Sequence, residues 1–126
     1  MKSYSVDKIP ESIIIFGEPL IYLLDAEGCY EKREFDHCMR IVISVWNAVT
    51  LDSVENTNKW TTSLLEHSKD GPPEMAAMVK LLIERKRTML NNDVRAVGEH
   101  WIKDRAGDLM FGCDARDVAN KYSKEK

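Results

Sequence analysis

Apolar residues between Phe35 and Val49 recur every three or four positions, which is the spacing of one face of an α-helix. A second apolar row lies beside the first and leaves only a narrow polar strip. The first row is Phe35, Met39, Val42, Trp46 and Val49, the second is Cys38, Ile41, Val45 and Ala48, and the strip is Asp36, Arg40, Ser44 and Asn47. A helix with so little polar surface is packed on most sides. We therefore predict a central helix over residues 31–50, on which the rest of the chain docks.

The preceding segment predicts a bent helix over residues 10–25, because apolar residues follow a proline and a glutamate at helical spacing. Pro19 removes the backbone hydrogen bond to the carbonyl of Ile15, and Gly17 adds freedom close by. We expect a kinked helix, or two short helices that meet near Gly17. A short strand over residues 13–16 is the alternative, since Ile-Ile-Ile-Phe also favours β structure.

Two more helices are predicted in the middle of the chain. Residues 51–59 are polar and rich in capping and turn residues, so they end the central helix. A short helix follows over residues 60–66, with Trp60 facing inward. Gly71-Pro72-Pro73 stops it, and a longer helix runs over residues 73–91. The predicted solvent side of this last helix carries Lys80, Glu84, Arg85, Lys86 and Arg87.

The pattern changes from helical to β after the last of these helices. Gly98 disfavours a helix, and residues 108–115 alternate between apolar and other side chains. Between them, the stretch 104–107 (Asp-Arg-Ala-Gly) has the residue types of a type I turn followed by a bulge. We predict a hairpin that pairs 94–103 with 108–115. An isolated hairpin is marginal in water, so its apolar face must lie on the helices or pair with another chain.

The size and composition of the chain favour a single domain. It has 126 residues, of which 44% are hydrophobic and 31% are charged. These values are ordinary for a globular protein and too apolar for a disordered one. The fold class that follows is α-dominated (α+β), a compact bundle of four to five helices with a C-terminal β-hairpin. The ends, about residues 1–8 and 117–126, are expected to be flexible.

Charge and cysteine usage bear on compartment and partners. The formal net charge is −3, which argues against a dedicated nucleic-acid binder. The three cysteines, Cys29, Cys38 and Cys113, form no CxxC pair, and the N-terminus lacks the apolar core of a signal peptide. No apolar run approaches the roughly 18–20 residues that span a bilayer. We therefore expect a cytoplasmic protein with free thiols and no membrane partner.

No catalytic set, metal site or cofactor is predicted. His37 and Cys38 are adjacent on a helix and so point about 100° apart, which is poor for sharing one ion. His67 and His100 lie in no known nucleophile motif, and no EF-hand or glycine-rich phosphate loop occurs. The only basic run, residues 85–87, lacks an aromatic platform for bases. A phosphate or nucleic-acid contact through this run and Lys80 stays a third hypothesis.

The first hypothesis for function comes from the hairpin. Trp101, Met110 and Phe111 place large apolar side chains there, and tryptophan is enriched at binding hot spots. One hairpin face could carry them all, with Leu109, and could either cover the helices or contact a partner. The sequence thus predicts a non-catalytic protein-interaction or regulatory module that binds a protein partner or a second copy of itself.

The alternative is a small-molecule-binding protein or small enzyme. Its site would lie between the helices and the hairpin, where Arg40, Asn47, His100 and Asp104 would supply the polar lining. Asn47 has a competing structural role, because an amide at the edge of a buried helix can hydrogen-bond a neighbouring backbone and hold it in register. If an active surface exists, we expect it where the polar strip of the central helix meets Trp101.

Overall fold

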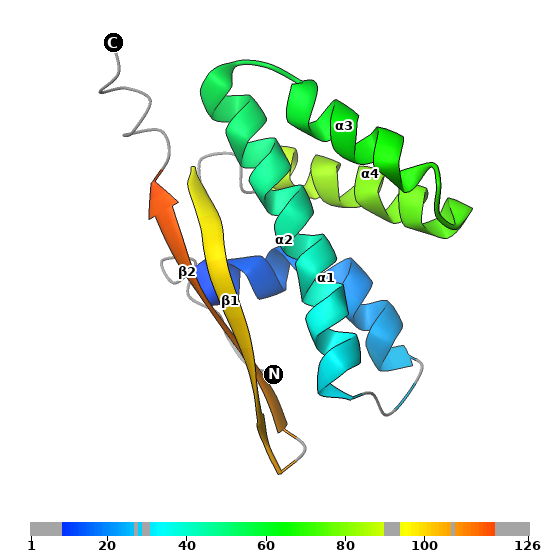
Figure 1. The fold of residues 1–126 in the computed structure, drawn as a ribbon, viewed down its shortest axis with the longest axis vertical. Helices are drawn as coiled ribbons and strands as arrows, with labels where there is room; N and C mark the ends of the chain where they lie inside the picture. Colours follow the sequence, from blue (N-terminus) through cyan, green and yellow to red (C-terminus); the bar gives the residue numbers. More distant parts are fainter. Residues whose placement is uncertain (1–8, 27, 29–30, 90–93, 107, 118–126) are drawn as a thin grey trace.

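The computed structural model describes residues 9–26, 28, 31–89, 94–106 and 108–117. Within them the chain forms four helices followed by an antiparallel two-stranded hairpin (Figure 1). The elements in order are α1 (Ile9–Ala26), α2 (Lys32–Glu55), α3 (Lys59–Ser68), α4 (Pro73–Met89), β1 (Arg95–Arg105) and β2 (Asp108–Asp117). The predicted helix-dominated α+β class, with its C-terminal hairpin, is confirmed.

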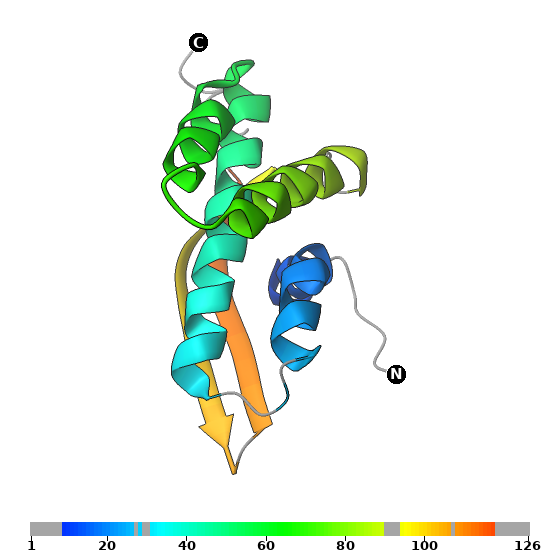
Figure 2. The same ribbon diagram turned by 90° about the vertical axis from the view of Figure 1, so that its right-hand side faces the viewer.

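Helix α2 is the centre of this arrangement. It runs along most of the molecule, with the hairpin on one side and α3 and α4 on the other (Figure 1), while α1 and α4 lie next to each other (Figure 2). The first predicted row is wholly buried, and Trp46 packs edge-on against Phe16 of α1, with their ring centroids 5.3 Å apart. The prediction of a central packed helix is therefore confirmed.

Helix α2 continues five residues beyond its predicted end at Thr50, because its last turns still have a buried side. There the carboxylate of Asp52 accepts hydrogen bonds from the backbone N–H of Trp60 (2.9 Å) and Thr61 (3.0 Å) and from the Thr61 hydroxyl (2.6 Å). Asp52 thus caps the N-terminus of α3 from the neighbouring helix. This arrangement leaves Trp60 40% exposed, so its predicted inward orientation is wrong.

Helix α1 is one helix that changes direction part-way along its length (Figure 1), as the Pro19 argument predicts, and the strand alternative does not occur. Arg85 of α4 compensates for the proline. Its Nη2 donates to the carbonyl of Ile15 (2.8 Å), the group that Pro19 leaves without a helical partner, and its Nε donates to the carbonyl of Phe16 (3.0 Å).

Two residues of the basic run on α4, Arg85 and Lys86, differ from their predicted solvent-facing role, whereas Arg87 is exposed as predicted. Lys86 is 1% exposed, and its Nζ lies 4.3 Å from the centroid of the Trp46 ring. The ammonium group is held against the face of the indole, a favourable cation–π contact. Arg85 and Lys86 thus both contact neighbouring helices.

The crossing of α1 and α2 depends on Gly17. An ideal Cβ at this position would lie 2.8 Å from both Cγ atoms of Val42, which is fully buried. We expect Gly17→Ala to destabilise the fold by about 1–2 kcal/mol, since overpacking outweighs the gain in helix propensity. Urea unfolding followed by circular dichroism measures the change.

Val42→Ala provides the control for this prediction, because it removes the methyl groups that the new Cβ would meet. The double variant G17A/V42A should be more stable than the sum of the two single effects allows. Strictly additive effects would show that the two positions do not constrain each other.

The hairpin pairs Arg95 with Asp117 at its open end and Arg105 with Asp108 at its turn, and a bulge lies between Val97 and His100. β1 is thus paired as far as Arg105, two residues beyond its predicted end, and the predicted type I turn over 104–107 is wrong. Ala106 has a φ of 54°, in the left-handed region, whereas a type I turn needs a negative φ there. Left-handed residues give two-residue turns the twist that suits a hairpin.

Candidate functional site

The polar strip of α2 meets β1 and holds it. Asn47 uses both ends of its amide on one residue: its Nδ2 donates to the carbonyl of Val97 (2.9 Å), and its Oδ1 accepts from the N–H of Val97 (2.7 Å). The neighbouring Trp46 donates from Nε1 to the carbonyl of Arg95 (2.7 Å). These backbone groups of β1 point to α2 rather than to β2, so side chains of α2 supply their hydrogen-bond partners at this edge of the hairpin. Asn47 therefore has the structural role that competed with ligand binding.

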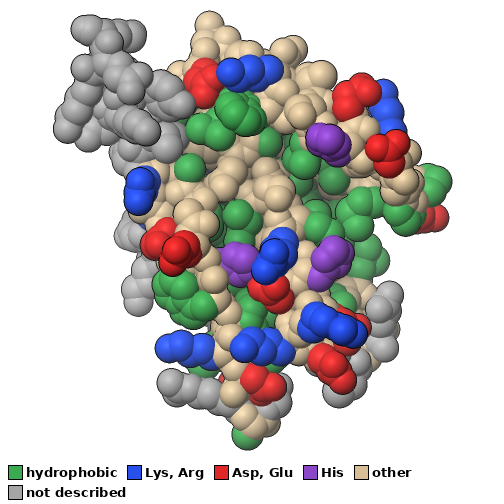
Figure 3. Space-filling model, viewed as in Figure 1, with side chains coloured by type: hydrophobic (Ala, Val, Ile, Leu, Met, Phe, Trp, Pro, Cys, Tyr) green, Lys and Arg blue, Asp and Glu red, His purple; other side chains and the backbone are tan. Residues whose placement is uncertain are grey.

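A second contact joins α2 to the hairpin through charged groups. His100 Nε2 lies 2.7 Å from Asp36 Oδ1, and Arg40 Nε donates to Asp36 Oδ2 at 2.9 Å. Figure 3 shows histidine, basic and acidic side chains together in the middle of this face. Two of the predicted site residues, Arg40 and His100, thus meet through Asp36, the strip residue four positions before Arg40.

This cluster changes the acidity of Asp36. Partial burial raises the pKa of this carboxyl, but the hydrogen bonds and charges of His100 and Arg40 lower it by more, so the pKa lies below its ordinary value. A pKa lower in the folded than in the unfolded chain means that ionised Asp36 stabilises the fold above its unfolded pKa of about 3.9. That contribution is lost as the pH falls through the folded pKa.

We therefore expect Asp36→Asn to flatten the acid side of the stability profile. Between pH 5 and pH 3, roughly the range over which a lowered carboxyl titrates, wild type should lose more unfolding free energy than the variant. Urea unfolding at several pH values measures this. Asp70→Asn, at an exposed aspartate after α3, is the matched control and should follow wild type. Parallel profiles for wild type and D36N would contradict the assignment.

The hairpin has one face on the helices and one in solvent. Val97, Ile102 and Cys113 are buried, and Leu109 and Phe111 pack against the same core. The cross-strand pairs Trp101–Gly112 and Lys103–Met110 form the other face, which we call the outer hairpin face. Trp101 is 45% exposed and Met110 48% exposed.

This division corrects the predicted grouping of Trp101, Met110 and Phe111 on one face. Successive residues of a strand point to opposite sides, so Phe111 covers the helices while Met110 points away from them. Trp101 likewise points away from the strip of α2, which meets β1 at Val97 and His100 instead. Its indole lies across Gly112, where a Cβ would collide with the ring.

The described residues proposed for a small-molecule site make separate contacts: Arg40 and His100 meet at Asp36, and the other two lie apart from them. Asn47 is bound to Val97, and Asp104 is exposed near the hairpin turn, opposite Leu109 in the register. An apolar cavity lies elsewhere, between α2, α3 and α4, and two of its lining residues are His37 and His67. Sequence reasoning missed it because it depends on how three helices cross, which periodicity within each helix does not indicate.

Thiol and metal chemistry can be judged for the described residues only. Cys38 and Cys113 are free and buried, and burial is the main cause that raises the pKa of each to about 11. A nearby acid, Asp25 or Asp114, adds to the rise in each case. Cys29 lies outside the described residues. Across the described ranges, no group of three or more His, Cys, Asp or Glu side chains is placed to hold a metal ion.

Comparison with known proteins gives no relative for this chain. No protein-family model matches it, and no curated protein and no solved structure matches it. Of the helices described, none is both long enough and apolar enough to cross a membrane.

Proposed function

We propose that the protein is a small non-catalytic interaction module, able to self-associate, and that its contact surface is the outer hairpin face. The observation that carries this proposal is the exposure of Trp101 beside Met110 on a face that the helices do not cover. Tryptophan and methionine are both enriched at protein interfaces, and tryptophan is among the residues that dominate their energetics. Lys103, which pairs with Met110 and lies two residues after Trp101, supplies a polar neighbour.

The firm attachment of the hairpin to the helices supports the same proposal. The hairpin is fixed to α2 through Asn47, Trp46 and His100, and β2 packs against α1. Preorganised side chains lose less conformational entropy when a partner binds them. A tryptophan on this surface therefore offers a large apolar contact at low cost in ordering.

Trp101 also has a structural role, because it shields the backbone at Gly112. That role uses one side of the ring and leaves nearly half of the side chain in solvent. Met110 faces Lys103 and shields no glycine, yet it is equally exposed. Shielding of the glycine backbone therefore does not explain why Trp101 and Met110 are both exposed.

The non-catalytic and cytoplasmic parts of the proposal rest on the cysteines. A thiol whose pKa is about 11 is almost wholly protonated at neutral pH, which suits neither Cys38 nor Cys113 to nucleophilic attack. Free thiols are the usual state in a reducing compartment, and we therefore place the protein in the cytoplasm.

The test compares Trp101→Ala with Trp60→Ala, since Trp60 of α3 has nearly the same exposure and lies on another surface. Light scattering over a range of concentrations measures self-association, and quantitative capture from cell extract measures binding of other proteins. We expect wild type and W60A to share an oligomer or a captured set of proteins that W101A loses. A protein that stays monomeric, with the same captured set in all three forms, would contradict the proposal.

A further inference from the structure

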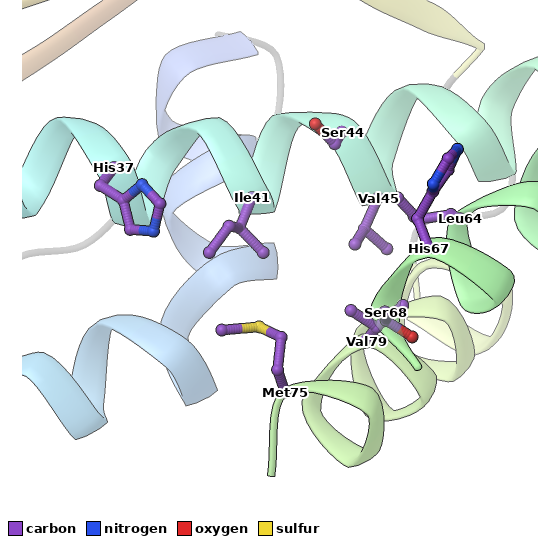
Figure 4. A pocket seen from close by; sticks show the side chains of 9 residues that line it. All are labelled: His37, Ile41, Ser44, Val45, Leu64, His67, Ser68, Met75 and Val79. Carbon is purple, nitrogen blue, oxygen red and sulfur yellow. The ribbon is translucent and has the colours of Figure 1, made fainter. Parts of the chain in front are cut away.

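A cavity of about 290 Å³ opens between α2, α3 and α4, on different elements from the outer hairpin face. Its apolar wall comes from three helices (Figure 4). The apolar residues are Ile41 and Val45 of α2, Leu64 of α3, and Met75 and Val79 of α4. The methionine is unbranched and adapts to irregular ligands. A space of this kind accepts an apolar group rather than a sugar or a nucleotide.

Few polar groups in the cavity are open to a ligand. The hydroxyl of Ser44 donates to the carbonyl of Arg40 (2.8 Å), and that of Ser68 donates to the carbonyl of Leu65 (2.7 Å). The imidazoles of His37 and His67 have no hydrogen-bond partner among the described residues, and Figure 4 shows them at opposite ends of the cavity. The cavity thus has an apolar middle and a polar group at each end.

The two ends differ in charge. Arg33 lies four residues before His37, on the same face of α2, and has no ion pair within the described part of the chain. At the other end, Asp70 follows His67 by three residues, close to the C-terminus of α3, where the helix dipole is negative. Glu34, three residues before His37, is tied to the N-terminus of α2 by the hydrogen bond that its carboxylate accepts from the N–H of Glu31 (3.0 Å). Arg33 and the positive N-terminal end of α2 therefore favour a negative group at the His37 end, whereas Asp70 and the C-terminus of α3 disfavour one at the His67 end.

We propose that this cavity binds a small anionic amphiphile, a single unbranched carboxylate of roughly ten carbons. An apolar cavity of about 150 Å³ holds benzene, so twice that volume takes roughly twelve heavy atoms, the size of decanoate. The carboxylate accepts a hydrogen bond from His37 near Arg33. The alkyl chain lies along Ile41 and Val45 toward His67.

Isothermal titration calorimetry of the full chain tests the size and charge of the ligand. The probes are hexanoate, decanoate and tetradecanoate, each below its micelle-forming concentration, with decan-1-ol and decylammonium as neutral and cationic partners of equal length. We expect decanoate to bind at least about tenfold more tightly than each of the others. Equal affinity for all chain lengths, or no binding of decanoate, overturns the proposal.

Variants locate the site. His37→Gln should weaken decanoate binding about tenfold and leave decan-1-ol unchanged, because it removes the imidazole whose N–H donates to the carboxylate. The matched control His67→Gln, at the other end, should leave decanoate within about twofold of wild type. Ile41→Trp fills the cavity and should abolish binding of every probe, and Met75→Trp replaces it if circular dichroism shows that I41W does not fold. Equal losses in H37Q and H67Q, or wild-type binding in a folded filling variant, overturn the proposal.

Phosphatidylglycerol vesicles distinguish a free acid from a membrane surface, which presents the same combination of acyl chain and negative charge. We expect no binding to vesicles, since the cavity has room for one short chain only. Binding to vesicles without binding of decanoate overturns the proposal in favour of a lipid surface.

Discussion

Replacing Trp46 by alanine is expected to destabilise the protein by about 4 kcal/mol, which is a large share of the roughly 5–15 kcal/mol that holds a domain folded. The side chain has no exposed surface and packs against Phe16, and its Nε1 donates to the carbonyl of Arg95. The substitution also removes the ring against which the ammonium of Lys86 lies. Thermal and urea unfolding measure the loss.

Two control variants separate the effect of burying a tryptophan from the effect of its hydrogen bond. Trp60→Ala, at an exposed tryptophan, should cost less than about 1 kcal/mol. Trp46→Phe keeps an aromatic ring but leaves the carbonyl of Arg95 without its donor, so it should fall between the two. If W46A were no less stable than W60A, α2 would not be the centre of the fold.

Replacing Asn47 by leucine is expected to destabilise the fold by about 2–3 kcal/mol, and mainly by loosening the hairpin. The change removes both hydrogen bonds to Val97 and leaves a partly buried N–H and C=O without partners. Hydrogen exchange resolves the effect by residue: the amide of Val97 should exchange much faster, while the core of α2 keeps its protection.

Ser44→Leu is the matched control, one turn earlier on the same strip. Ser44 is exposed, and its hydroxyl donates only within its own helix, to the carbonyl of Arg40. This variant should leave the exchange of Val97 unchanged. An amide of Val97 that exchanges at the wild-type rate in N47L would show that another contact holds the hairpin.

The helices could be predicted because their signals are local. The apolar rows of α2 repeat with the geometry of the helix itself, and the Gly-Pro-Pro break before α4 acts on the backbone directly. Pro19 even indicated which carbonyl would lack a partner. The sequence did not indicate that Arg85, far along the chain, would supply the donor.

The predictions that are wrong concern contacts between different helices and strands. Lys86 looked like a solvent residue because lysine is rarely buried, and only the crossing of α4 with α2 brings it over Trp46. The sequence groups Trp101 with Phe111 because both are apolar and near the turn. The register that pairs Trp101 with Gly112, and so separates it from Phe111, depends on the turn at Ala106 and on the bulge after Val97.

The sequence predicts the residues of the candidate site better than their contacts, because those contacts also join different elements. Trp101, Met110, Arg40, His100 and Asn47 were selected by residue type and by their place on a face. Whether each faces solvent, a helix or a partner is decided by tertiary packing. The cavity near His37 is outside the reach of such reasoning, since it depends on how α2, α3 and α4 cross.

The most direct test of the proposed contact surface is methionine oxidation by dilute peroxide, followed by mass spectrometry, on the free protein and on its oligomer or complex. Met110 and Met89 have similar exposure, 48% and 57%, but lie on different elements, the hairpin and the end of α4. We predict that association slows the oxidation of Met110 several-fold and leaves Met89 unchanged. Unchanged oxidation of Met110 in the associated form, or protection of Met89 in its place, would contradict the account.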